Sequence, residues 1–190
     1  MPQSIPGPPA NLSFSHVGFY VHDLPKMEEF YTRVLGFFAT DRGIARGAPI
    51  VFLSRDPKEH HQIILAEGRT GGPEARVVNQ VALRAGSLQD LRDMLAILEN
   101  EAEVSQIDPI NHGNAWSLYF RDPEGNRIEV FVDSPWYVEQ PLIEPLDLSQ
   151  SDDEIHDRTR SAYGGSPTFR PAEEWRAEFG EKLRAAGLPV

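Results

Sequence analysis

The sequence predicts an α+β fold in which paired βαβββ modules form an open, mixed-sheet cup followed by a helical tail. Three observations lead to this prediction: a weak internal repeat, a change from strand to helix periodicity in each copy, and a Pro- and acid-rich composition after residue 135. The repeat has an offset of 64 residues and pairs residues 16–34 with residues 80–98. The expected divisions are an extended arm over 1–11, a domain over 12–135 with modules at 12–67 and 77–135, and a tail over 136–190.

The first copy begins with a strand whose two faces differ. Apolar residues at alternate positions from 17 to 21 define one face, so His16 points to the other. Asp23 is placed to cap the following helix, Pro25 suits its first turn, and Gly36 is expected to end it. The apolar face of the strand is therefore expected to pack against this amphipathic helix.

The second copy repeats this pattern. Ser87 is the expected N-cap, leucines between 88 and 98 form the apolar stripe, and Gln80 falls at the position of His16. A tight turn is expected at 122–125. Further strands are predicted at about 37–41, 49–54, 61–67, 103–107, 114–121 and 126–132, and tail helices near 151–160 and 171–187. We expect the tail to be strapped over the domain or over a partner subunit.

The composition excludes several kinds of site and partner. None of the 190 residues is cysteine, so disulfides, thiolate metal sites and cysteine nucleophiles are excluded and a reducing cytoplasm is expected. The net charge of −11 argues against nucleic acid as a partner. No apolar segment of 18 residues occurs and the N-terminus lacks a signal-peptide pattern, so neither a membrane span nor a leader is expected.

His16, Gln80 and Glu129 all fall on the strand faces turned away from the helices. Ile128 and Val130 supply the core side of the last strand, so the Glu129 carboxylate is directed into the cup. A buried carboxylate costs several kcal/mol unless it is paired or binds a metal. The pattern therefore favours one cation held by His16 and Glu129, with an ion pair from Arg127 or Arg84 to Glu129 as the alternative.

Three segments carry a resemblance to a known family: residues 15–37, residues 61–68, and residues 112–131, which read HGNAWSLYFRDPEGNRIEVF. They resemble the type I extradiol ring-cleavage dioxygenases of the vicinal oxygen chelate superfamily, and the similarity covers roughly residues 12–135. The run DPEGNRIE is typical of the superfamily, and Tyr119, ten residues before Glu129, is typical of the dioxygenases. In that family two histidines and one glutamate hold a ferrous ion, with positions open for a catecholate and dioxygen.

The resemblance implies a role for each matching residue. His16 matches the first histidine ligand, and Glu129 matches the carboxylate ligand. His61 matches the histidine that acts as acid and base beside the metal. Tyr119 resembles the tyrosine that hydrogen-bonds the bound substrate oxygen, and His112 matches a second histidine outside the ligand set.

Gln80 departs from the family pattern, which has its second histidine ligand at this position. A glutamine amide oxygen binds hard divalent ions, but it is a weaker donor than imidazole. Two interpretations follow. Either Gln80 is a working ligand in a His-Gln-Glu site, or the site has lost tight metal binding.

A glyoxalase-like isomerase is the competing enzyme class in the superfamily, and it uses four protein ligands. The fourth position aligns with Ile64, which cannot bind a metal, unless a shift of one or two residues brings Gln62 or His61 there. An open three-ligand site is therefore favoured over a four-ligand site.

The sequence thus predicts a dioxygenase that cleaves a catechol-like aromatic, with a divalent metal, Fe(II) by resemblance and Mn, Ni or Zn as further options. Its expected partners are a small aromatic substrate, dioxygen and a second copy of the chain. The resemblance to the family is the reason to expect this homodimer. A non-oxidative isomerase or lyase and a non-catalytic protein that binds an aromatic ligand are the alternatives.

Overall fold

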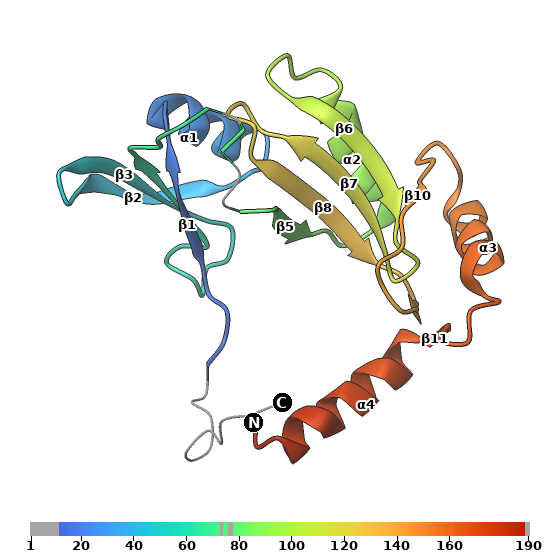
Figure 1. The fold of residues 1–190 in the computed structure, drawn as a ribbon. Helices are drawn as coiled ribbons and strands as arrows, with labels where there is room; N and C mark the ends of the chain where they lie inside the picture. Colours follow the sequence, from blue (N-terminus) through green and yellow to red (C-terminus); the bar gives the residue numbers. More distant parts are fainter. Residues whose placement is uncertain (1–11, 73, 76–77, 189–190) are drawn as a thin grey trace.

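A computed structural model describes residues 12–72, 74–75 and 78–188, so the predicted arm at 1–11 lies outside the described residues. Its first sheet has the strand order β1-β4-β3-β2 (Figure 1). The strands are β1 (Val17–Val21), β2 (Phe38–Ala45), β3 (Ala48–Ser54) and β4 (Ile63–Glu67). β1 and β4 are parallel and the other pairs are antiparallel, so this sheet is mixed as predicted.

The second sheet repeats this arrangement with an added strand. Its order is β10-β6-β7-β8-β5, with β5 and β8 parallel. The strands are β5 (Val81–Arg84), β6 (Ser105–Asn111), β7 (Ala115–Arg121), β8 (Arg127–Asp133) and β10 (Glu144–Pro145). The predicted α+β fold with two open mixed sheets is confirmed, and the tail contributes β10 to one edge.

Each sheet is covered by the helix that the repeat predicted. Asp23 caps α1 (Leu24–Arg33) by accepting from the Lys26 amide, and Ser87 caps α2 (Leu88–Leu98) by accepting from the Asp90 amide. Gly36 follows α1 with φ of 67°, a left-handed conformation that glycine adopts without strain. Apolar side chains from both helices and both sheets form one core, including Met27, Phe30, Leu53, Leu91, Leu118 and Ile128.

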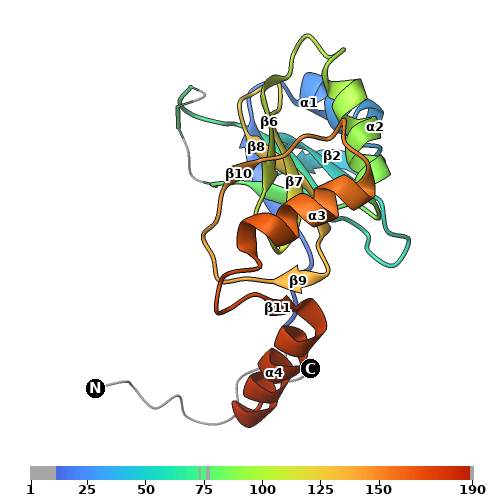
Figure 2. The same cartoon turned by 90° about the vertical axis from the view of Figure 1, so that its right-hand side faces the viewer.

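The tail helices also confirm the prediction. Ser151 forms a capping box with Glu154 at the start of α3 (Asp152–Tyr163), and α4 (Ala172–Ala185) follows. In α3, Ile155 enters the main core, and the buried Thr159 hydroxyl accepts from Trp116 Nε1 at 3.0 Å. Figure 2 shows α3 lying across the second module, whereas α4 extends away from it. The short strands β9 (Trp136–Tyr137) and β11 (Arg170–Pro171) join α4 to the domain.

Two strands differ from the prediction. β2 continues to Ala45 and forms a hairpin with β3, because Arg46 and Gly47 take positive φ values of 52° and 85° at its tip. β6 begins at Ser105 and runs to Asn111, later than the predicted 103–107. The tight turn at 122–125 is present, with the Gly125 amide donating to the Asp122 carbonyl at 2.9 Å.

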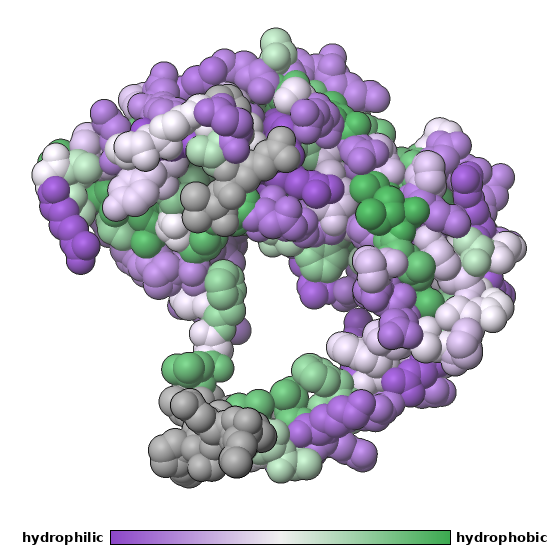
Figure 3. Space-filling model, in the orientation of Figure 1, coloured by the Kyte–Doolittle hydropathy of each residue, from purple (hydrophilic) through white to green (hydrophobic). Residues whose placement is uncertain are grey.

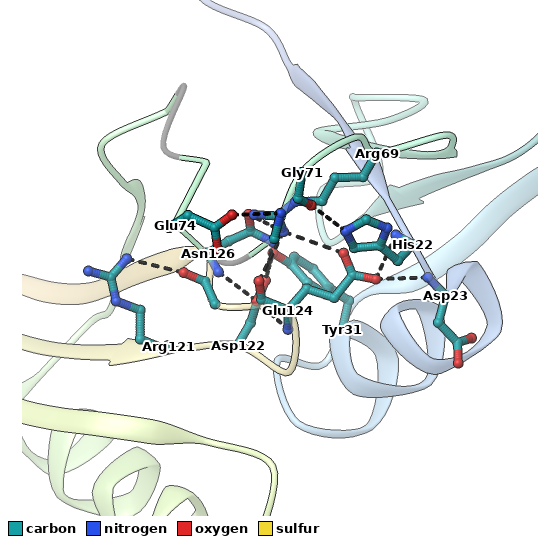
Figure 4. A network of polar contacts seen from close by, with 12 residues as sticks. His22, Asp23, Tyr31, Arg69, Gly71, Glu74, Arg121, Asp122, Glu124 and Asn126 are labelled. Carbon is teal, nitrogen blue, oxygen red and sulfur yellow. Dashed lines mark hydrogen bonds and ion pairs between the residues drawn. The ribbon is translucent and has the colours of Figure 1, made fainter.

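A polar network at the β7–β8 turn joins the two modules (Figure 4). The Glu124 Oε1 atom accepts from the amides of His22 and Asp23 at 2.7 and 2.8 Å, just before α1. Arg69 donates to the Glu124 carbonyl at 3.0 Å, and their side chains are 9% and 7% exposed. We call the group Glu124, Arg69, Asp122 and Tyr31 the inter-module latch. Because its bonds are buried and charge-assisted, the latch fixes one module against the other.

Tyr31 belongs to the buried part of the latch. It is fully buried and donates to Asp122 Oδ2 at 3.2 Å, and burial, followed by the nearby Asp122 charge, raises the Tyr31 pKa well above its ordinary value. A raised tyrosine pKa in the folded state means that the folded chain retains a proton that the unfolded chain loses above pH ~10. Stability from this group is therefore present below that pH and is lost as the pH rises.

We expect Tyr31→Phe to be less stable than the wild type by about 1–2 kcal/mol at pH 8, because Asp122 loses a buried donor. The difference should shrink between pH 8 and pH 11, because only the wild type must keep Tyr31 protonated in the fold. Urea unfolding at the two pH values measures both quantities. A difference that is constant or grows with pH would contradict this account.

Candidate metal and substrate site

The site centres on the Glu129 carboxylate. The alternation of β8 places Ile128 and Val130 in the core and turns Glu129 to the opposite face, where it is only 7% exposed. It accepts three hydrogen bonds from neutral donors: Gln80 Nε2 at 2.5 Å on Oε2, and Ser117 Oγ and Tyr119 OH, both at 2.7 Å on Oε1.

The Glu129 negative charge has no ionic partner within the described part of the chain. The predicted alternative of an ion pair with Arg84 is not seen, because Arg84 pairs with Asp133 at the far end of β5. Arg127 forms no ion pair with Glu129 and instead stacks on the Tyr119 ring, with its guanidinium carbon 4.1 Å from the ring centroid. A buried carboxylate with neutral donors alone fits a site whose positive charge comes from a bound cation.

Tyr119 and His112 extend this network. Burial, and then the hydrogen bond to Glu129, raises the Tyr119 pKa to about 12, so the phenol is protonated at neutral pH. His112 Nε2 lies 3.1 Å from the Tyr119 hydroxyl, and His112 Nδ1 lies 2.6 Å from the Leu142 carbonyl.

The contact with the Leu142 carbonyl indicates the tautomer of His112. A carbonyl only accepts, so the Leu142 contact requires a proton on His112 Nδ1. In a neutral His112 ring, Nε2 and Glu129 then compete for the single phenolic proton of Tyr119. The Tyr119 hydroxyl therefore lies between two acceptors, His112 Nε2 and Glu129 Oε1.

The histidines of the first module form a second group. The rings of His16 and His61 lie 4.3 Å apart between centroids, and the nearest nitrogens of His60 and His61 are 2.9 Å apart. Desolvation, and then the neighbouring His16 and His60, lower the His61 pKa, so the ring is neutral at neutral pH. His16 is exposed just before β1, and its Nδ1 contacts Ser15 Oγ at 3.3 Å.

The structure brings the predicted residues together as two groups. Gln80, Tyr119, His112 and Glu129 share one hydrogen-bonded network, and His16 lies beside His61. His16 makes no hydrogen bond or ion pair with Gln80 or Glu129. Over the described ranges, no group of three or more His, Asp or Glu side chains could hold a metal ion.

Strand register identifies the fourth ligand position of the competing enzyme class. Gly18 pairs with Ile64 in the first sheet, and Ala82 pairs with Glu129 in the second. Ile64 is therefore the counterpart of Glu129, as the alignment of the repeat indicated. Gln62 accepts from the Arg55 amide at 2.9 Å and so has another partner.

Sequence reasoning missed Ser117 and the stacking of Arg127. Ser117 is fully buried and donates to Glu129, and it lies two residues before Tyr119 on β7, on the same face. Because residues two apart on a strand share a face, counting back two positions from Tyr119 would have identified Ser117 as a site residue. Arg127, two residues before Glu129, shares the Glu129 face for the same reason.

Comparison with known proteins identifies the superfamily of this chain. Residues 13–130 match the Glyoxalase/Bleomycin resistance protein/Dioxygenase superfamily, and the chain belongs to this superfamily. Two similar curated relatives are dioxygenases of Rhodococcus globerulus. Biphenyl-2,3-diol 1,2-dioxygenase 3 is 30% identical over 63% of this chain and 63% of the relative, and biphenyl-2,3-diol 1,2-dioxygenase 2 is 29% identical over 66% and 65%. The chain thus spans a little under two thirds of the length of these relatives.

Solved structures share the fold at lower sequence identity. A glyoxylase/bleomycin resistance protein/dioxygenase domain from Frankia sp. superposes with a TM-score of 0.56 at 21% identity, covering 66% of this chain and 100% of that domain. A fosfomycin resistance protein from Listeria monocytogenes, solved with Mn(II) and sulfate, gives 0.52 at 16% identity over 64% and 93% of the two chains. In the described part of the chain, no helix combines the length and apolarity needed to cross a membrane.

Proposed function

We propose that this chain is a metal-dependent dioxygenase of the extradiol type, which cleaves the ring of a catechol-like aromatic. The observation that carries the proposal is the Glu129 carboxylate, buried in the cup and surrounded by neutral donors. The names of the Rhodococcus relatives support an aromatic diol as substrate and dioxygen as co-substrate.

The proposed metal ligands are His16, Gln80 and Glu129, with Fe(II) as the native ion. Imidazole, amide and carboxylate together suit a divalent ion of intermediate hardness. Gln80 ligation requires the amide oxygen, and an amide whose nitrogen faces Glu129 presents that oxygen after a rotation of its terminal group. When bound, the metal would neutralise the two substrate oxygens and hold dioxygen beside the ring.

The residues around this ligand set would handle protons. In the proposal, His112 Nε2 accepts a proton that the diol releases on binding, and the Tyr119 hydroxyl lies between His112 and Glu129. His61, next to His16, is the proposed acid and base on the opposite side of the cup. Tyr119 would also donate to a substrate oxygen, because the Ser117 hydroxyl remains as a donor to Glu129.

The direct test is to load the purified protein with ferrous iron under argon and to measure oxygen uptake with a panel of catechols. The proposal predicts oxygen consumption together with the yellow absorbance of a ring-opened product. Manganese, nickel and zinc loading test the other metals. Turnover without oxygen uptake would instead support an isomerase or lyase, and stoichiometric binding of aromatics without metal would support a binding protein.

We predict that Gln80→His raises ferrous-iron affinity by about tenfold or more, because imidazole is a better donor than an amide to this ion. Calorimetric titration under argon measures the dissociation constant. Gln62→His is the matched control, since Gln62 sits near β4 and bonds to Arg55. An unchanged affinity in Gln80→His would mean that residue 80 does not bind the metal.

We also propose a homodimer, because the cup side of the first sheet leaves large apolar side chains exposed. Tyr20 and Phe38 are 63% and 76% exposed there, and before β1 the chain stands away from the body with Phe14 86% exposed (Figure 3). A second copy would remove such surface from water. Light scattering on the eluting protein measures the mass, and a monomer at micromolar concentration would refute the proposal.

A further inference from the structure

A separate cavity of about 360 Å³ lies between the two modules. The cup-side residues Gly18 and Tyr20 of β1 form part of its wall, and the ends of β7 and β8 form another part. Its charged wall residues are Arg69, Arg121 and Arg127. Arg69 is paired with Glu124 in the inter-module latch, and no carboxylate is among the described wall residues. This concentration of positive charge is unexpected in a chain with 29 acidic and 18 basic residues. The cavity therefore has the electrostatic character of an anion site.

Two of these arginines face each other. Arg121 and Arg127 are direct partners in the antiparallel pairing of β7 with β8. Arg121 is held in place by Gln106 Oε1 and the Gly125 carbonyl, both at 3.1 Å.

Arg127 connects this cavity to the Glu129 site. Its guanidinium stacks on the ring of Tyr119, whose hydroxyl donates to Glu129. Stacking holds the guanidinium plane fixed while its N–H groups stay available at the edge. Arg127 is half-buried, and it has no ion-pair partner among the residues that the structure describes.

We propose that the substrate carries an anionic group, most simply a carboxylate on the aromatic ring, and that Arg127 binds this group in the cavity. The inference rests on the proposed function for the identity of the diol, but the anion site itself does not depend on oxygen chemistry. A planar carboxylate matches the fork of a guanidinium and receives two parallel hydrogen bonds from it. The substrate would then differ from biphenyl-2,3-diol, the compound in the names of the Rhodococcus relatives, which carries an uncharged ring substituent.

The test compares an acid with its ester on the metal-free protein. The probes are 3,4-dihydroxybenzoate and its methyl ester, and calorimetry measures their binding. A second pair, phenylphosphonate and benzoate, shows whether the site prefers a phosphonate or a carboxylate. The wild type should bind the acid at least about tenfold more tightly than the ester. The Arg127→Met variant should lose this preference, and Arg127→Lys should retain part of it because the charge remains.

Arg84→Met is the matched control. Arg84 also stacks on a ring of the second sheet, with 4.6 Å from its guanidinium carbon to the Phe131 centroid, but it lies outside the cavity. It should keep the full preference for the acid. Equal binding of acid and ester by the wild type, no binding of the acid, or an undiminished preference in a folded Arg127→Met protein would each overturn the proposal.

The same probes separate this inference from the proposed function. An acid preference that depends on Arg127, without oxygen uptake from any diol, would retain the anion site and reject ring cleavage. Oxygen uptake that is equal for the acid and the ester in the wild type and in Arg127→Met would retain ring cleavage and reject the anion site.

Discussion

Glu129→Gln is expected to abolish ferrous-iron binding and to lower the catechol-dependent oxygen uptake by about a thousandfold or more. The neutral amide retains the shape of the carboxylate, but it removes the only acidic oxygen donor of the proposed ligand set. With iron at about a hundred times its dissociation constant, the wild type should gain about 2.7 kcal/mol of stability. That gain corresponds to a rise of about 5–10 °C in the unfolding midpoint for a chain of this size, and the variant should show none.

Ser117→Ala is the control for Glu129→Gln. It removes one of the three donors to Glu129 but leaves the carboxylate in place. Iron should still raise its unfolding midpoint by several degrees. Scanning fluorimetry under argon, with and without ferrous iron, compares the three proteins. A midpoint that rises equally with iron in Glu129→Gln and in the wild type would show that the metal binds elsewhere.

Glu124→Ala is expected to destabilise the fold by about 3 kcal/mol, because Glu124 is a buried charged residue with several partners. The substitution removes the acceptor of the His22 and Asp23 amides and leaves the nearly buried Arg69 without its carboxylate. The unfolding midpoint should fall by about 6–12 °C. Glu124→Gln should lose less, because its carbonyl oxygen still accepts from an amide.

Glu103→Ala is the matched control for the latch. Glu103 also forms an ion pair with the first module, through Lys26 at 2.6 Å, but both side chains are well exposed. Water screens such a pair, so the midpoint should change little. Chemical unfolding of the three variants measures the difference. If Glu124→Ala were as stable as Glu103→Ala, the β7–β8 turn would not hold the modules together.

The sequence predicted those parts of the fold that depend on periodicity. Alternation set the faces of β1 and β8, and cap residues set the starts of α1 and α2, because these signals are local. The predicted strand at 37–41 is shorter than β2, which runs to Ala45, because the segment around Gly43 and Gly47 lacks apolar alternation. The latch was not predicted as a contact, because the His22 amide and Glu124 are separated by 102 residues.

The candidate site was predicted to a similar extent. The faces of Gln80 and Glu129 followed from alternation, and the structure joins them by a hydrogen bond. The pairing of His16 with His61 required the parallel register of β1 and β4, which one sequence does not give. The stacking of Arg127 on Tyr119 depends on side-chain rotamers and was likewise beyond a pattern of residue types.

The central claim is that one divalent ion is bound by residues from both modules. Crystals grown under argon with ferrous iron, measured on both sides of the iron absorption edge, test it most directly. The account predicts one anomalous peak within bonding distance of His16, Gln80 and Glu129. A peak bound to residues of one module alone, or no peak in the cup of a folded and iron-saturated protein, would contradict it.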